Sequence, residues 1–129
     1  MRDRLRRVWH QHARAWRIAL LITVVGVLLL VLPLGNHPRW QSLLNAAHVP
    51  LFALPSALWV WALRGEGCSR WRALSSVALL GGALAVGSEV LQYWIPGRWP
   101  DRADLARNLL GLGLGLLVGA LLPRWRRDI

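Results

Sequence analysis

The chain has 129 residues, of which 55% are apolar, and its formal net charge of +10 gives a sequence pI near 11.9. Long apolar runs in so short a chain are typical of integral membrane proteins and not of small soluble domains. The charge does not indicate nucleic-acid binding, because the arginines gather at the ends of the apolar runs, where the positive flanks of membrane helices belong. A single cysteine, Cys68, excludes both a disulfide within the chain and a cysteine-based metal site.

The first 17 residues are rich in arginine, and they are predicted to form a cytoplasmic juxtamembrane segment. Trp9 and Trp16 lie among the arginines, as tryptophans do at a headgroup boundary. Residues 18–34 follow as the first predicted membrane span, without any charge. Its polar interruptions are limited to Thr23 and Gly26, so we expect this helix to face lipid and to carry no site.

Residues 43–63 form the second predicted span, which places a histidine inside the membrane. His48 lies early in this span, with Phe52 four residues later on the same helical face. Pro50 and Pro55 are tolerated in membrane helices but leave backbone carbonyls open to other partners. A lone intramembrane histidine is often a hydrogen-bonded packing residue, so His48 by itself fits a structural role as well as a functional one.

Residues 73–95 form the third predicted span, whose small residues allow close helix approach. Ser88, Glu89 and Gln92 stand near its far end, in a segment that is otherwise almost pure hydrocarbon. A carboxylate there costs a few kcal/mol on insertion-type scales, so Glu89 marks a functional site or a structural pair.

Residues 103–122 form the fourth predicted span and carry one regular stripe. The stripe follows spacings of four, three, four and four residues and consists of Asp104, Asn108, Gly111, Gly115 and Gly119. We expect this face to pack into a helix bundle, with the glycines allowing backbones to meet and the polar residues projecting toward neighbours. Gly113 lies off the stripe, and residues 123–129 form a basic cytoplasmic tail.

The distribution of arginine predicts the orientation of these four spans. The amino-terminal segment, the middle loop and the tail carry six, three and three arginines, whereas the other two loops hold only Arg39, Arg98 and Arg102. The positive-inside rule therefore predicts that both termini are cytoplasmic. The expected fold is an all-α integral membrane bundle of four transmembrane helices (18–34, 43–63, 73–95 and 103–122) in the cell inner membrane, forming one domain over residues 18–122.

This orientation brings the polar residues of three spans to one depth, near the outer face. The residues predicted to line a polar pocket there are His48, Glu89, Gln92, Arg98, Asp104 and Asn108. In one account the cluster only fixes packing: Glu89 pairs with Arg98 or His48, and Asp104 caps the fourth helix. In the other, Arg98 holds a phosphate or carboxylate, which its planar guanidinium suits, while Glu89 and His48 bind a headgroup or act as an acid–base pair.

These residues, in this order and spacing, resemble the VanZ-like family of small bacterial membrane proteins. The resemblance rests on His48 with Phe52, Ser88-Glu89-x-x-Gln92, Pro96-Gly97-Arg98, and the stripe from Asp104 to Gly115, and it covers roughly residues 43–122. It implies a multi-helix membrane fold, a role in the cell envelope, and the six residues of the predicted pocket as motif positions. The founding member is associated with low-level teicoplanin resistance. One departure is Asn45, where the family often has a lysine.

The predicted function is binding of an envelope lipid, a lipid-linked precursor or a lipoglycopeptide-type amphiphile at the outer leaflet. The first alternative is an intramembrane hydrolase or transferase acting on a lipid headgroup, with His48 and Glu89 as candidate catalytic residues, although no G-x-S-x-G motif is present. The second is a small proton-coupled exporter, for which Glu89 lies too close to one face. No metal, cofactor or nucleic acid is expected. The small-residue faces suit packing within one chain or between copies in a homo-oligomer.

Overall fold

The computed structural model describes residues 2–31, 38–97 and 99–124, and every regular element in them is a helix. All four helices contain a stretch long and apolar enough to cross a membrane, which confirms the predicted fold class. Their bounds are α1 Arg2–Val31, α2 Pro38–Gly65, α3 Arg70–Tyr93 and α4 Arg102–Leu121.

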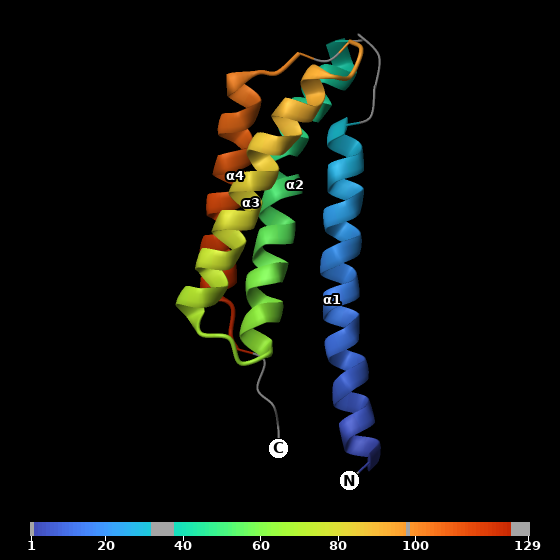
Figure 1. Cartoon of the computed structure of the whole chain (residues 1–129), viewed down its shortest axis with the longest axis vertical. Coiled ribbons are helices and arrows are strands. Elements are labelled where there is room, and N and C mark those ends of the chain that lie inside the picture. The colour runs from blue at the N-terminus through green and yellow to red at the C-terminus, as the bar shows by residue number, and fades with distance from the viewer. Residues whose placement is uncertain (1, 32–37, 98, 125–129) are drawn as a thin grey trace.

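Helix α2 lies at the centre of the bundle (Figure 1). It packs most extensively on α4 and also contacts α1 and α3, whereas α1 and α3 share only a small contact. The start of α1, the α2–α3 loop and the end of α4 lie at one end, which we call the terminal end (Figure 1). The α3–α4 connection lies at the opposite end, which we call the connection end.

Helix α1 begins well before the predicted first span. The arginine-rich segment continues without a break into the membrane-competent stretch Ala13–Val31. No proline or glycine interrupts the chain before Gly26, so nothing in the sequence ends the helix earlier. Helix α1 exposes a broad apolar surface, including Leu20 and Leu21, and packs its other side against α2, where Ala19 and Leu30 are 0% and 2% exposed.

The stripe of α4 packs into the bundle as predicted, and its glycines set the distance to α2. All five stripe residues, from Asp104 to Gly119, are buried. A Cβ atom on Gly111 would lie 2.3 Å from the carbonyl oxygen of Val49, and one on Gly115 would lie 2.4 Å from that of Ala53. Gly113, off the stripe, has open space around it. The backbones of α2 and α4 therefore approach more closely than any side chain would allow.

At the terminal end, Arg64 closes the last turn of α4. Its guanidinium is buried, and Nη1 donates to the carbonyl oxygens of Gly119, Ala120 and Leu122 at 2.9, 3.1 and 2.9 Å. The last carbonyls of a helix have no partner within the helix, and a cation is favoured beside them. The sequence alone indicates only that Arg64 is one of the positive residues that flank a membrane span. In the fold, it connects the end of α2 to the end of α4.

Candidate functional site

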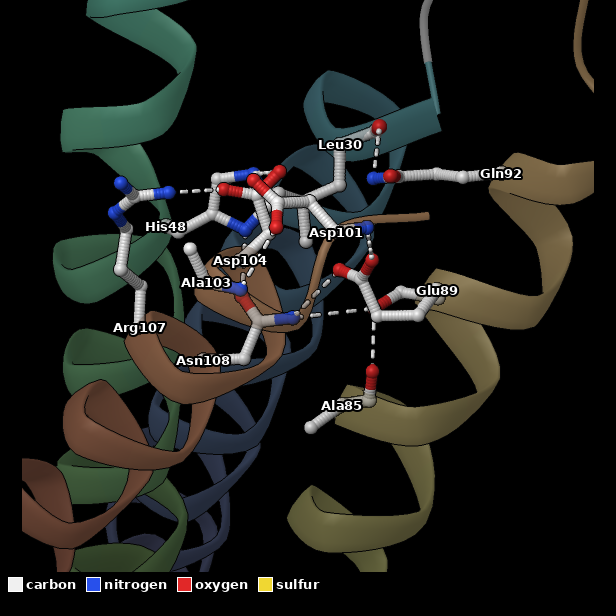
Figure 2. A network of polar contacts seen from close by, with 11 residues as sticks. Leu30, His48, Ala85, Glu89, Gln92, Asp101, Ala103, Asp104, Arg107 and Asn108 are labelled. Carbon is white, nitrogen blue, oxygen red and sulfur yellow. Dashed lines mark hydrogen bonds and ion pairs between the residues drawn. The ribbon is translucent and has the colours of Figure 1, made fainter. Parts of the chain in front are cut away.

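A buried group of polar side chains lies at the connection end, where α2, α3 and α4 meet (Figure 2). We call it the polar cluster, and its members are His48 of α2, Ser88 and Glu89 of α3, and Asp104 and Asn108 of α4. Counted over the whole residue, none of them is more than 8% exposed. Helical spacing brings them inward, since His48 shares a face with Phe52, Glu89 with Ala85, and Asn108 with Gly111.

Asn108 is at the centre of the polar cluster and is 0% exposed. Its Oδ1 lies 2.6 Å from Nδ1 of His48, and its Nδ2 donates to Oε1 of Glu89 at 3.3 Å, with Oγ of Ser88 at 3.5 Å (Figure 2). The amide nitrogen faces the carboxylate because a carboxylate accepts hydrogen bonds. The amide oxygen, which can only accept, is therefore left for His48. One amide side chain thus joins three helices.

This contact decides which nitrogen of His48 carries a proton. Because Oδ1 of Asn108 accepts, the proton of a neutral His48 lies on Nδ1, and Nε2 presents a lone pair. Nε2 is buried and has no hydrogen-bond partner among the described residues. The nearest carboxylate oxygen, Oδ2 of Asp104, lies 3.8 Å away, beyond hydrogen-bonding distance. Nε2 and Oδ2 together form a small region that can accept hydrogen bonds but contains no donor.

Among the described residues, the hydrogen bonds to Glu89 come from backbone and amide donors. Its Oε1 accepts from Asn108, and its Oε2 accepts from the backbone nitrogen of Asp101 at 3.3 Å. The second contact ties α3 to the residue that precedes α4. Of the two partners that the packing account offers for Glu89, His48 makes no direct contact with it, because Asn108 lies between them. The other, Arg98, lies outside the described residues.

The cap of α4 is Asp101 and not Asp104. The Asp101 side chain accepts from the backbone nitrogen of Ala103 at 2.9 Å, which is the N-cap arrangement. The expectation that Asp104 caps this helix is therefore wrong. Asp104 lies inside the first turn, where its Oδ1 forms an ion pair with Arg107 while Oδ2 faces His48. Sequence reasoning missed Arg107, although its spacing of three residues from Asp104 on a helix is a signal for such a pair.

Two of the predicted pocket residues are not part of the polar cluster as the structure describes it. Gln92 is buried, but its Nε2 donates to the carbonyl oxygen of Leu30 at 3.3 Å and so secures the last turn of α1. Arg98 lies outside the described residues, so its predicted role as an anion ligand stays a prediction.

The polar cluster is suited to proton exchange and hydrogen bonding more than to nucleophilic attack. Ser88 is 2% exposed, and its hydroxyl donates to the carbonyl oxygen of Ala85 at 2.9 Å, which leaves it poorly placed as a nucleophile. Among the described residues, no three His, Cys, Asp or Glu side chains are grouped so as to hold a metal ion. The reactive feature that remains is Nε2 of His48 beside Oδ2 of Asp104.

The fold and the polar cluster together define a multi-pass membrane protein with an ionisable cluster between its helices. The model of the VanZ/LLP1 family matches residues 3–123, which is nearly the whole chain, and the chain belongs to this family. No curated protein and no solved structure matches the sequence.

Proposed function

We propose that this VanZ-like protein binds the headgroup of an amphiphile at the outer leaflet of the inner membrane. The ligand would be an envelope lipid, a lipid-linked precursor or a lipoglycopeptide-type molecule, and the polar cluster would be its binding site. This orientation is supported by the arginines of the terminal end, which belong on the cytoplasmic side. The connection end then faces outward, with the polar cluster at headgroup depth.

The unpartnered Nε2 of His48 is the observation that carries the proposal. The side-chain oxygens and nitrogen of Asn108 and Glu89 all have hydrogen-bond partners, whereas Nε2 of His48 has none among the described residues. Leaving a buried acceptor without a hydrogen bond costs about 1–3 kcal/mol of stability. A cluster that served packing alone would gain from a donor at this position. A ligand ammonium group could donate to Nε2 of His48 and Oδ2 of Asp104 together, and a ligand hydroxyl could donate to one of them.

Access to the polar cluster is supported by the residues at its rim. The side chains of Asp104 and Arg107 are 11% and 36% exposed, so this ion pair connects the buried histidine to the surface. Arg107 would hold the anionic part of a headgroup, and Arg39 and Arg102 are exposed at the same end. The ligand class that fits is therefore a headgroup with a hydrogen-bond donor and an anionic group.

A reaction on the headgroup is the second candidate, and the same two atoms favour it. An imidazole nitrogen with a free lone pair beside a carboxylate is the arrangement that general-base catalysis uses, with Asp104 stabilising the imidazolium that forms. The base would activate water and not Ser88. The exporter has less support, because both oxygens of Glu89 are already hydrogen-bonded.

The orientation is tested by cysteine labelling of intact cells with a membrane-impermeant maleimide. The native Cys68 in the α2–α3 loop is expected to stay unlabelled until the membrane is opened. In a Cys68→Ser background, Trp99→Cys is expected to react from outside, since Trp99 is 83% exposed at the connection end. If Cys68 reacts in intact cells and the cysteine at position 99 does not, the protein has the opposite orientation in the membrane.

The binding proposal is tested by replacing His48 with asparagine and measuring retained lipid. His48→Asn can keep a donor near the position of Nδ1 for Asn108 but removes Nε2. We expect the variant to accumulate and fold like the wild type. The amount of lipid that native mass spectrometry detects on the purified protein should be at least tenfold lower than on the wild type. Glu89→Gln is expected to lower both retention and any protection against lipoglycopeptides.

Undiminished lipid on folded His48→Asn and Glu89→Gln proteins would contradict the binding site and favour the packing account. If the lipid bound to the wild-type protein stays chemically unaltered during incubation, the result supports binding without a reaction. Conversion of the co-purified lipid on incubation, abolished by His48→Asn, would support the enzyme.

A further inference from the structure

A cavity of about 360 Å³ lies between α1, α2 and α3, away from the polar cluster's own contacts. We call it the apolar groove. At the connection end it is lined by Leu30, Phe52 and Leu84, and at the terminal end by Trp16, Trp59 and Leu63. Trp16 and Leu30 belong to the same helix and are about 21 Å apart along its axis, so the apolar groove runs along the helices.

Most polar side chains that line the apolar groove are hydrogen-bonded within the protein, and Ser76, which also lines it, is exposed. The hydroxyl of Thr23 donates to the carbonyl oxygen of Ala19 at 2.7 Å and accepts from Nε1 of Trp59 at 2.9 Å. The hydroxyl of Ser56 donates to the carbonyl oxygen of Phe52 at 2.6 Å. An occupant of the apolar groove therefore meets mostly hydrocarbon surface, and a polar occupant would lose hydrogen bonds to water and replace few of them.

The two ends of the apolar groove differ. At the terminal end, the rings of Trp16 and Trp59 pack edge to face with centroids 5.0 Å apart, and Nε1 of Trp16 donates to Glu66 at 3.3 Å. At the connection end, Phe52 lies one helical turn from His48, so the apolar groove begins directly beneath the polar cluster. A molecule with a polar head at the polar cluster would find an apolar groove below it.

The dimensions favour a single hydrocarbon chain over a helix. A helix has a diameter of about 10 Å with its side chains, and a cavity of about 360 Å³ that extends along the helices is too narrow for one. Helices α1 and α3, which both line the apolar groove, share only a small contact, and Leu80 on its lining is 71% exposed. In a membrane, that exposed part of the lining faces the acyl chains of the surrounding lipid.

We propose that the apolar groove takes one hydrocarbon chain of the lipid whose headgroup binds at the polar cluster, with the chain end against Trp16 and Trp59. This inference rests on the proposed function and narrows its ligand to molecules with a long unbranched or isoprenoid chain. It also assigns α1 a role in binding, although α1 contributes no side chain to the polar cluster.

The test is photo-crosslinking with a phosphatidylglycerol that carries a diazirine near the end of one acyl chain. Its headgroup offers both hydroxyl donors and a phosphate. In the purified full-length protein, we expect label on the peptide containing Trp59 and Leu63. Val27→Trp, which fills the apolar groove, is expected to reduce that label at least fivefold, whereas Val25→Trp, on the exposed side of the same helix, leaves it unchanged.

A second matched pair covers the case in which Val27→Trp fails to fold. Leu80 lines the mouth of the apolar groove and Leu79 does not, and both are more than 70% exposed, so Leu80→Trp and Leu79→Trp are expected to be tolerated equally. Only Leu80→Trp should lower the label. Equal labelling of groove-filling variants and their controls, or label spread evenly over outward residues such as Leu28, would overturn the inference.

The same assay separates this inference from the proposed function. Label that groove filling removes but His48→Asn leaves unchanged would support the apolar groove as a chain site and contradict the headgroup site. The opposite result is that His48→Asn removes the retained lipid, whereas Val27→Trp and Leu80→Trp leave the chain label unchanged. It would support the headgroup site and contradict the chain site.

Discussion

Replacing Gly115 with leucine is expected to cost about 3 kcal/mol or more of stability and to leave little folded protein in detergent. The first atom of the new side chain would already lie 2.4 Å from the carbonyl oxygen of Ala53 and 2.6 Å from Cβ of Ser56. The closer of these is backbone of α2, which cannot rotate out of the way. The two helices would have to separate, and the contact between α2 and α4 is the most extensive in the bundle.

Gly113→Leu is the matched control, because Gly113 lies two residues away on the same helix with nothing within 4 Å of an added Cβ. We expect its yield and thermal midpoint to stay within error of the wild type, and Gly115→Ala to fall between the two. The measurement is size-exclusion chromatography with thermal scanning of each variant in one detergent. Equal stability of the two leucine variants would mean that α2 and α4 do not meet at the glycine stripe.

Replacing Asn108 with leucine is also expected to have a large effect, lowering the free energy of unfolding by about 2–5 kcal/mol. The change leaves Nδ1 of His48 and Oε1 of Glu89 buried without their shared partner, at about 1–3 kcal/mol for each group. Leucine has nearly the same volume, so the loss reports hydrogen bonds more than cavity formation. Thermal or denaturant unfolding of the purified variant measures it.

Ser88→Ala controls for the loss of a buried polar group nearby. Ser88 contacts Asn108 only at 3.5 Å, and its hydroxyl otherwise bonds to its own helix, so we expect a loss of less than about 1 kcal/mol. A double-mutant cycle between Asn108→Leu and His48→Leu should give a coupling energy of about 0.5–3 kcal/mol. Additive losses would show that Asn108 and His48 do not share a hydrogen bond, and the assignment of the free Nε2 would fall with it.

The packing and functional accounts of the polar cluster are therefore not exclusive. Asn108, Glu89 and the backbone of Asp101 form a satisfied set of contacts that orders three helices. The same contacts fix the tautomer of His48 and leave its Nε2 without a hydrogen-bond partner in the described part of the chain. Stability is expected to depend most on Asn108, and ligand binding most on Nε2 of His48, so the two roles can be measured separately.

The sequence by itself determined how many helices there are and which face of α4 is buried. Long apolar runs predict membrane spans because the bilayer thickness demands about 20 residues, and the spacing from Asp104 to Gly119 predicts a stripe because side chains three and four residues apart share a helical face. The depth of His48, Glu89 and Asn108 along their helices also followed from residue counting. All three are buried together at the connection end.

Only the tertiary structure decided which side chains pair, because depth along a helix does not say how that helix is rotated relative to its neighbours. The rotation places Asn108 between His48 and Glu89, turns Gln92 toward α1, and aims Arg64 at the end of α4. In the same arrangement, Asp101 caps the amino terminus of α4 and the Asp104 side chain faces His48. The apolar groove depends on three separate helices, so no single stretch of sequence contains a sign of it.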